Sequence, residues 1–109
     1  MTTDPAALRA DLLAARRARD EHAIRAVGSL LTAIANAEAV PVADERYRVV
    51  EGTAEAPRHE LSEEDIAEIV AAELDERSRA IKEYRRIGAD TAALEAECAV
   101  LERYRVDAG

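Results

Sequence analysis

The sequence predicts an all-α protein: a small bundle of about four helices, with the third and fourth as an antiparallel hairpin and a long loop at about 40–60. Apolar residues recur at spacings of three and four in four separate segments, which is the period of an amphipathic helix. Ala, Glu, Arg and Leu dominate, and aromatic residues make up only 3%, which favours helices packed closely through small side chains. A chain of 109 residues is long enough for one domain, 1–109, with a modest core.

The first helix is expected to begin after Asp4, an N-cap residue, with Pro5 at the first helical position, where the missing N–H costs nothing. The segment ARRAR (15–19) places cations in the last turn, where they suit the helix dipole. The apolar face of this helix holds Leu8, Leu12 and Ala15.

The second helix is expected within 21–39, where Asp20 either caps a new helix or marks a kink in a continuous one. Gly28 lies inside the pattern. It either weakens the helix by about 1 kcal/mol relative to Ala or lets another helix approach closely. The apolar positions are Ile24, Val27, Leu31 and Ile34.

Residues 40–60 interrupt the helical pattern with two prolines and a glycine. Within them, RYRVV (46–50) is compatible with a short strand or with a turn packed on the helices. Such a connection is long for a compact helical domain, so a role of its own is expected.

The third helix is expected to start after Ser62, an N-cap residue followed by acids in the first turn, with Leu61 packing on Ile66 as a hydrophobic staple. It should run to about Ile87 and stop at Gly88, which favours the left-handed conformation that ends helices. The fourth helix restarts at Asp90-Thr91, and the short turn makes the two helices a hairpin. The apolar positions of the fourth helix are Leu94, Cys98, Leu101 and Tyr104.

One face of the third helix is apolar at both ends and charged in its middle: Ile66, Val70, Glu73, Arg77, Ala80, Tyr84 and Ile87. Glu73 and Arg77 are four residues apart and pair along the helix, and Glu97 of the fourth helix is a further partner. The second helix ends with Asn36 and Glu38, which complete a candidate polar cluster. Either this cluster is a structural network that fixes helix register, or it is a ligand or partner site.

A basic group of Arg16, Arg17, Arg19 and Arg25 is the best candidate for contact with nucleic acid. Another cationic group is that of Lys82, Arg85 and Arg86. The alternative is that both are ordinary charges at helix ends and on solvated faces. The net charge of −8 argues against a broad nucleic-acid surface, so only a local patch is expected.

No hydrolase, P-loop, dinucleotide-binding or zinc-protease motif is present. His22 and His59 are far apart, and Cys98 on an apolar face is typical of a buried, inert thiol. The sequence therefore predicts no catalytic residue, no metal site and no cofactor. With one cysteine, no apolar run of about 20 residues and no secretory signal, a soluble cytoplasmic protein is expected.

The segments TAIANAEAV (32–40) and HELSEEDIAEIVAAELDERSRAIKEYRRIGADTAALEAECAVLERY (59–104) resemble the YqeY-like (GatB/YqeY) family. In that family an N-A-E or N-K-E segment ends one helix, and E-L-[ST]-x-E-[DE] opens the next. An E-x-x-x-R pair, an aromatic, a Gly and A-E-x-x-x-L-x-x-Y follow, covering most of the chain. The matching residues are Asn36, Glu38, Glu73, Arg77, Tyr84, Gly88, Glu97, Leu101 and Tyr104.

This family is related to the tail domain of the GatB subunit of aspartyl/glutamyl-tRNA amidotransferase, and that resemblance implies contact with tRNA. The family is also catalogued under carbon–nitrogen ligase activity with glutamine as amido donor. Two departures matter. Members commonly continue past the final Tyr into a second helical domain, so only the N-terminal domain is expected here. Many relatives also carry Arg where this chain has Gly28.

Three functional hypotheses follow. The first is a non-catalytic module bound to tRNA or to an aminoacylation or amidotransferase protein, through the arginines of the first helix. The second is a protein-interaction or homo-oligomerising module, such as a homodimer with a mass near twice 11.9 kDa. The third is participation in glutamine-dependent amide transfer, which would require Glu73 or Glu97; general acid–base groups alone supply no nucleophile for that reaction.

Overall fold

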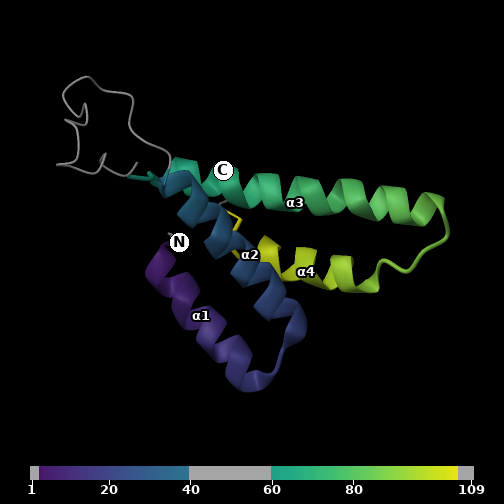
Figure 1. Ribbon diagram of the computed structural model, residues 1–109, viewed down its shortest axis with the longest axis horizontal. Coiled ribbons are helices and arrows are strands. Elements are labelled where there is room, and N and C mark those ends of the chain that lie inside the picture. Colours follow the sequence, from purple (N-terminus) through teal and green to yellow (C-terminus); the bar gives the residue numbers. More distant parts are fainter. Residues whose placement is uncertain (1–2, 40–59, 106–109) are drawn as a thin grey trace, which may run out of the picture.

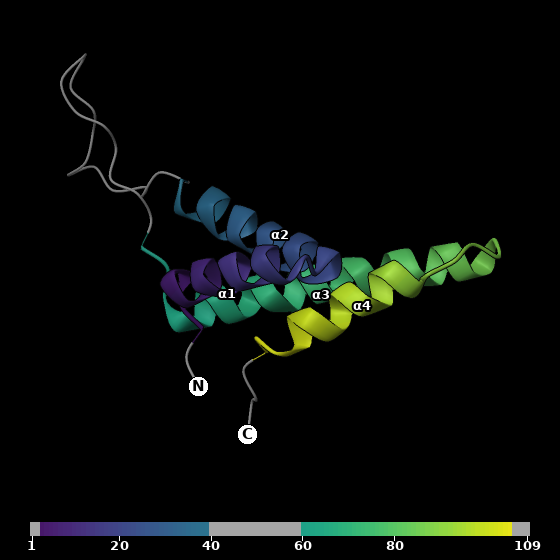
Figure 2. The same cartoon turned by 90° about the horizontal axis from the view of Figure 1, so that it is seen from below.

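The computed structural model describes residues 3–39 and 60–105, which form four α-helices and no strand. In chain order these are α1 (Pro5–Ala18), α2 (Glu21–Glu38), α3 (Glu63–Arg86) and α4 (Ala92–Glu102). The helix α3 is the longest, and α4 runs back beside it in the opposite direction (Figures 1 and 2). The all-α prediction is confirmed. The predicted loop falls almost wholly outside the described residues, as does the segment 46–50.

The starts of three helices follow the capping signals of the sequence. Asp4 accepts a hydrogen bond from the Ala7 N–H at 2.9 Å, and Asp20 accepts one from the Ala23 N–H at 3.1 Å. At α3 the Ser62 hydroxyl accepts from the Asp65 N–H at 3.1 Å, and the Asp65 carboxylate accepts from the Ser62 N–H at 2.9 Å. Each cap satisfies backbone donors that a helix start leaves unpaired.

Two helices end with a residue in the left-handed conformation. Gly88 has φ +78° after α3, and the Ala89 N–H donates to the Tyr84 carbonyl at 2.8 Å. Arg19 has φ 56° after α1, and the Asp20 N–H donates to the Ala15 carbonyl at 3.0 Å. The geometry is the same, but only the first site uses glycine, the residue that adopts this conformation without a steric penalty.

The core lies around α2, which packs against α1, α3 and α4, while α3 and α4 pack against each other. Leu61 is half-buried and packs against the core cluster, which includes Ile66. Gly28 has no heavy atom within 4 Å of the position its Cβ would occupy, so it serves no close helix approach. The largest fully buried side chains are Leu8, Val27, Leu30, Ile34, Val70 and Leu101.

The far end of the predicted α3 stripe is not part of the core. Tyr84 is 45% exposed and Ile87 is 73% exposed, whereas Ile81 is buried. The reason is visible in Figure 1: the last turns of α3 extend beyond α2, and only the start of α4 and the loop that leads to it lie beside them. A helix that contacts one neighbour buries a narrower face than one that contacts two.

Candidate functional site

A charged cluster lies inside the bundle, where the middle of α3 meets α4. The guanidinium of Arg77 donates to Glu97 Oε1 at 3.0 Å and lies 3.4 Å from Glu73 Oε1. It also donates to the Glu73 backbone carbonyl at 3.2 Å. Glu73 and Glu97 are only 9% and 8% exposed. The structure therefore brings three of the predicted cluster residues together at a buried position.

The fourth member of this cluster is Ser29 of α2, which the sequence pattern did not indicate. Its hydroxyl donates to Glu73 Oε1, so one hydrogen-bond network joins α2, α3 and α4. A single serine in an Ala-rich helix carries no distinctive signal. Its one clue is position, because it lies two helical turns before Asn36 on nearly the same face.

Asn36 and Glu38 were predicted in the cluster, and the structure places them elsewhere. Asn36 is exposed and Glu38 half-buried, and no hydrogen bond or ion pair between described residues joins either to the three charged side chains. The prediction identified the correct face of α2, but it placed the contact with the cluster two helical turns too far along the helix. Asn36 lies seven residues past Ser29, about 10 Å farther along the helix axis.

The buried cluster is closed by its own contacts. Among the described residues, no buried side-chain nitrogen or oxygen lacks a hydrogen-bond partner. A buried ion pair of this kind adds little net stability over apolar packing, but removal of one member leaves an uncompensated charge. This arrangement favours the structural network over the ligand site, and it suits a role in fixing helix register.

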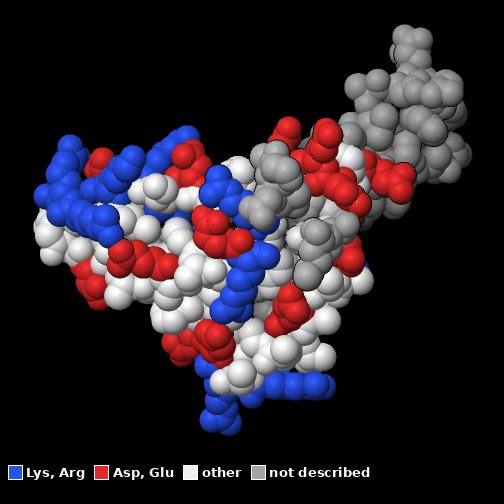
Figure 3. All heavy atoms as spheres, turned by 180° about the vertical axis from the view of Figure 1, so that it is seen from behind, with Lys and Arg blue, Asp and Glu red and all other residues white. Residues whose placement is uncertain are grey.

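A basic corner, defined as Arg16, Arg17, Arg19 and Arg25, lies where α1 turns into α2. All four side chains are exposed. Among the described residues, no acid forms an ion pair with any of them. Figure 3 shows blue spheres gathered at the bottom of the molecule, where this turn lies. Two acids, Asp20 and Glu21, lie in the same stretch, and Asp20 is engaged as the α2 cap.

The second cationic group lies at the end of α3 and differs from the basic corner. Arg85 contacts Glu95 at 2.5 Å, and Arg86 contacts Glu83 at 2.7 Å. Two of the cations that the sequence grouped there are therefore neutralised by neighbouring acids. This difference makes the basic corner the stronger candidate for binding an anion.

Cys98 of α4, expected as a buried thiol, is half-buried. Burial raises the pKa of its thiol, against the opposing effect of the nearby Arg77 charge. A thiol with a raised pKa is mostly protonated near neutral pH and is a poor nucleophile. In residues 3–39 and 60–105, no group of three or more His, Cys, Asp and Glu side chains could hold a metal ion, and His59 lies outside that part.

Comparison with protein families, with curated proteins and with solved structures found no match to this chain. Across the described helices, none combines the length and apolar character that crossing a membrane requires.

Proposed function

We propose that this protein is a non-catalytic cytoplasmic binding module of the GatB/YqeY type that docks on the phosphate backbone of tRNA through its basic corner. The observation that carries the proposal is the set of four exposed arginines with no ion-pair partner among the described residues. The motif resemblance supports the choice of tRNA, because the related amidotransferase tail is thought to contact tRNA. An aminoacylation or amidotransferase protein is the partner to test next if tRNA does not bind.

The chemistry of the corner suits phosphate. A guanidinium group donates two parallel hydrogen bonds to phosphate oxygens, and exposed groups meet a ligand without first breaking an ion pair. Arg19 holds the left-handed conformation that glycine adopts more easily, and it places an exposed cation at the turn itself. The overall charge of −8 opposes approach of RNA elsewhere, so binding is expected to be weak and confined to this patch.

The proposal is tested by fluorescence anisotropy with labelled unfractionated tRNA, from low to physiological salt. Four phosphate contacts predict a log–log salt slope of about −3 to −4. The Arg16→Gln, Arg17→Gln, Arg19→Gln variant should lose most of the affinity and flatten the slope. No binding of the unchanged protein at low salt, where screening is weakest, would overturn the tRNA assignment.

A matched control is the Arg9→Gln, Arg86→Gln, Arg103→Gln variant. It removes the same number of positive charges from exposed positions on α1, on α3 and directly after α4, all outside the basic corner. Equal loss of affinity in both variants would show a response to net charge alone and would contradict docking at the basic corner.

A further inference from the structure

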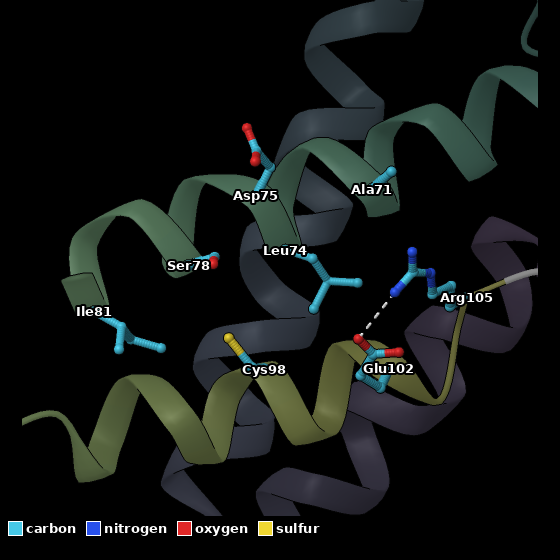
Figure 4. A pocket seen from close by; sticks show the side chains of 8 residues that line it. All are labelled: Ala71, Leu74, Asp75, Ser78, Ile81, Cys98, Glu102 and Arg105. Carbon is cyan, nitrogen blue, oxygen red and sulfur yellow. Dashed lines mark hydrogen bonds and ion pairs between the residues drawn. The ribbon is translucent and has the colours of Figure 1, made fainter.

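The outer face of the α3–α4 hairpin contains an open hollow of about 460 Å³. Figure 4 shows Leu74, Ile81 and Cys98 projecting between the two helices, with α1 and α2 behind them. Leu74 and Cys98 are half-buried, and Ile81 is buried where α3 packs against α4. Apolar and polar side chains alternate along this face, with Asp75 and Ser78 beside Leu74, and none of the described helices covers it.

The α3 side of this hollow belongs to a longer stripe of one helix face. Residues Ala71, Leu74, Asp75, Ser78 and Ile81 line the hollow at spacings of three and four. Continued toward the start of α3, the same spacing reaches the exposed acids Glu64 and Glu68. Continued toward the end, it reaches the exposed cation Lys82 and then Arg85, which pairs with Glu95 of α4. Figure 3 shows red spheres at the start of α3 and blue spheres at its far end.

The stripe has acids at one end and cations at the other, so two copies that lie antiparallel place the acids of each opposite the cations of the other. We infer that a second copy of this chain docks on the hairpin face, α3 against α3 and antiparallel, with a two-fold axis between Leu74 and Asp75. In that register Glu68 of one copy faces Ile81 and Lys82 of the other. Glu64 faces Arg85, which within its own copy pairs with Glu95, so Glu68 and Lys82 carry most of the charge complementarity. A two-fold interface requires such self-complementarity, because the same patch serves both copies.

The middle of the stripe fits the same register. Ala71 of one copy faces Ser78 of the other, and these small side chains allow two helices to approach closely. The two Leu74 side chains meet beside the axis, and the two Asp75 carboxylates next to them each keep Arg79 of their own chain as a partner. A parallel arrangement would set acids against acids and cations against cations. The contact is a single helix pair with charged ends, so the dimer is weak and is weakened further by salt.

This dimer does not depend on the proposed tRNA contact, because the basic corner lies on α1 and α2 and contributes nothing to the stripe. A variant that loses tRNA binding should therefore still dimerise, and a variant that loses dimerisation should still bind tRNA. The two proposals can fail separately.

Sedimentation equilibrium over a range of protein concentrations tests the dimer. The unchanged protein should approach twice 11.9 kDa at low salt. Glu68→Lys or Lys82→Glu should weaken self-association at least about tenfold, since each places like charges opposite one another twice in the dimer. An equimolar mixture of the two variants should restore the dimer, as should both changes in one chain. Glu76→Lys is the control, because it makes the same charge change off the stripe.

A cross-linking experiment tests the register itself, in a Cys98→Ser background. Positions 71 and 78 lie two turns, about 10 Å, apart within one chain, too far for a disulfide. The Ala71→Cys, Ser78→Cys variant should therefore form only covalent dimers with oxidised glutathione, whereas Ala71→Cys alone should not. A monomer at every concentration, dimerisation unaffected by the charge changes, or equal cross-linking of both cysteine variants would overturn the proposal.

Discussion

The buried cluster and the basic corner use the same side chains in opposite ways. At the α3–α4 contact, Arg77 is held between Glu73 and Glu97, both nearly buried. At the turn between α1 and α2, arginines stand in solvent with no acidic partner among the described residues. The first site uses its charges in contacts within the chain. The second leaves them available to another molecule.

This difference predicts which property a charge change should alter, stability or binding affinity. Substitution of the buried Arg77 leaves two carboxylates close together in a poorly solvated site, so it should lower the free energy of unfolding. An exposed guanidinium interacts weakly with its own chain, so the effect is on binding. The same substitution at the two sites should therefore separate stability from affinity.

The largest effect is expected for Arg77→Ala. The substitution removes the shared partner of Glu73 and Glu97, and loss of one member of a buried ion pair typically costs about 3–5 kcal/mol of unfolding free energy. Urea unfolding followed by circular dichroism measures this. Arg79→Ala is the control, since Arg79 pairs with Asp75 in solvent and should change stability by less than about 1 kcal/mol. Equal effects would mean that the cluster is not buried in solution.

A smaller effect of opposite sign is expected for Arg19→Gly. Glycine adopts the left-handed conformation of this position without steric strain, although it also increases the entropy of the unfolded chain. The balance of these two effects should stabilise the protein by about 0.5–1 kcal/mol, measured by the urea midpoint. The same variant should bind tRNA more weakly, because it loses one cation of the basic corner. Loss of stability would contradict the strained turn.

The smallest effect concerns Tyr104, which lies between the two extremes of burial. Its hydroxyl donates to Asp11 at 2.7 Å, and burial together with this bond raises the pKa of the phenol to about 12. The unfolded chain has a tyrosine pKa of about 10, so its contribution to stability is complete below pH 10 and is lost as the pH rises toward 12. Partial exposure makes the change modest.

The measurement for Tyr104 is the melting temperature from about pH 9 to about pH 12 in the unchanged protein and in Tyr104→Phe. Stability of the unchanged protein should fall more steeply across that interval, and the two curves should converge at its upper end. Parallel curves would show that the hydroxyl titrates alike in the folded and unfolded chains.

Local structure was largely predictable because its causes are local. Asp4, Asp20 and Ser62 cap the helices that follow them, and Gly88 ends α3, since a cap depends only on residues within one turn of the chain. The pairing of Glu73 with Arg77 was predictable for the same reason. Arg19 shows the limit of such rules, because its left-handed conformation carries no glycine signal.

The candidate sites were predictable only in part. The four arginines of the basic corner are identifiable by type and spacing, but their lack of partners among the described residues depends on which acids the fold brings near them. Ser29 joined the buried cluster in place of Asn36 because the crossing point of α2 over α3 selects one turn of the helix. Spacing along a sequence identifies a face and cannot identify that turn.

The sequence by itself therefore determined the helical class, the boundaries of the helices and the charged interruption of α3, because periodicity and capping act within a few residues. The tertiary structure decided which apolar positions near the end of α3 became core. Ile81 is buried while Tyr84 and Ile87 of the same helical segment are exposed, because α3 extends past α2 at that end. Burial depends on which neighbour a face meets, and residues distant in the sequence set that neighbour.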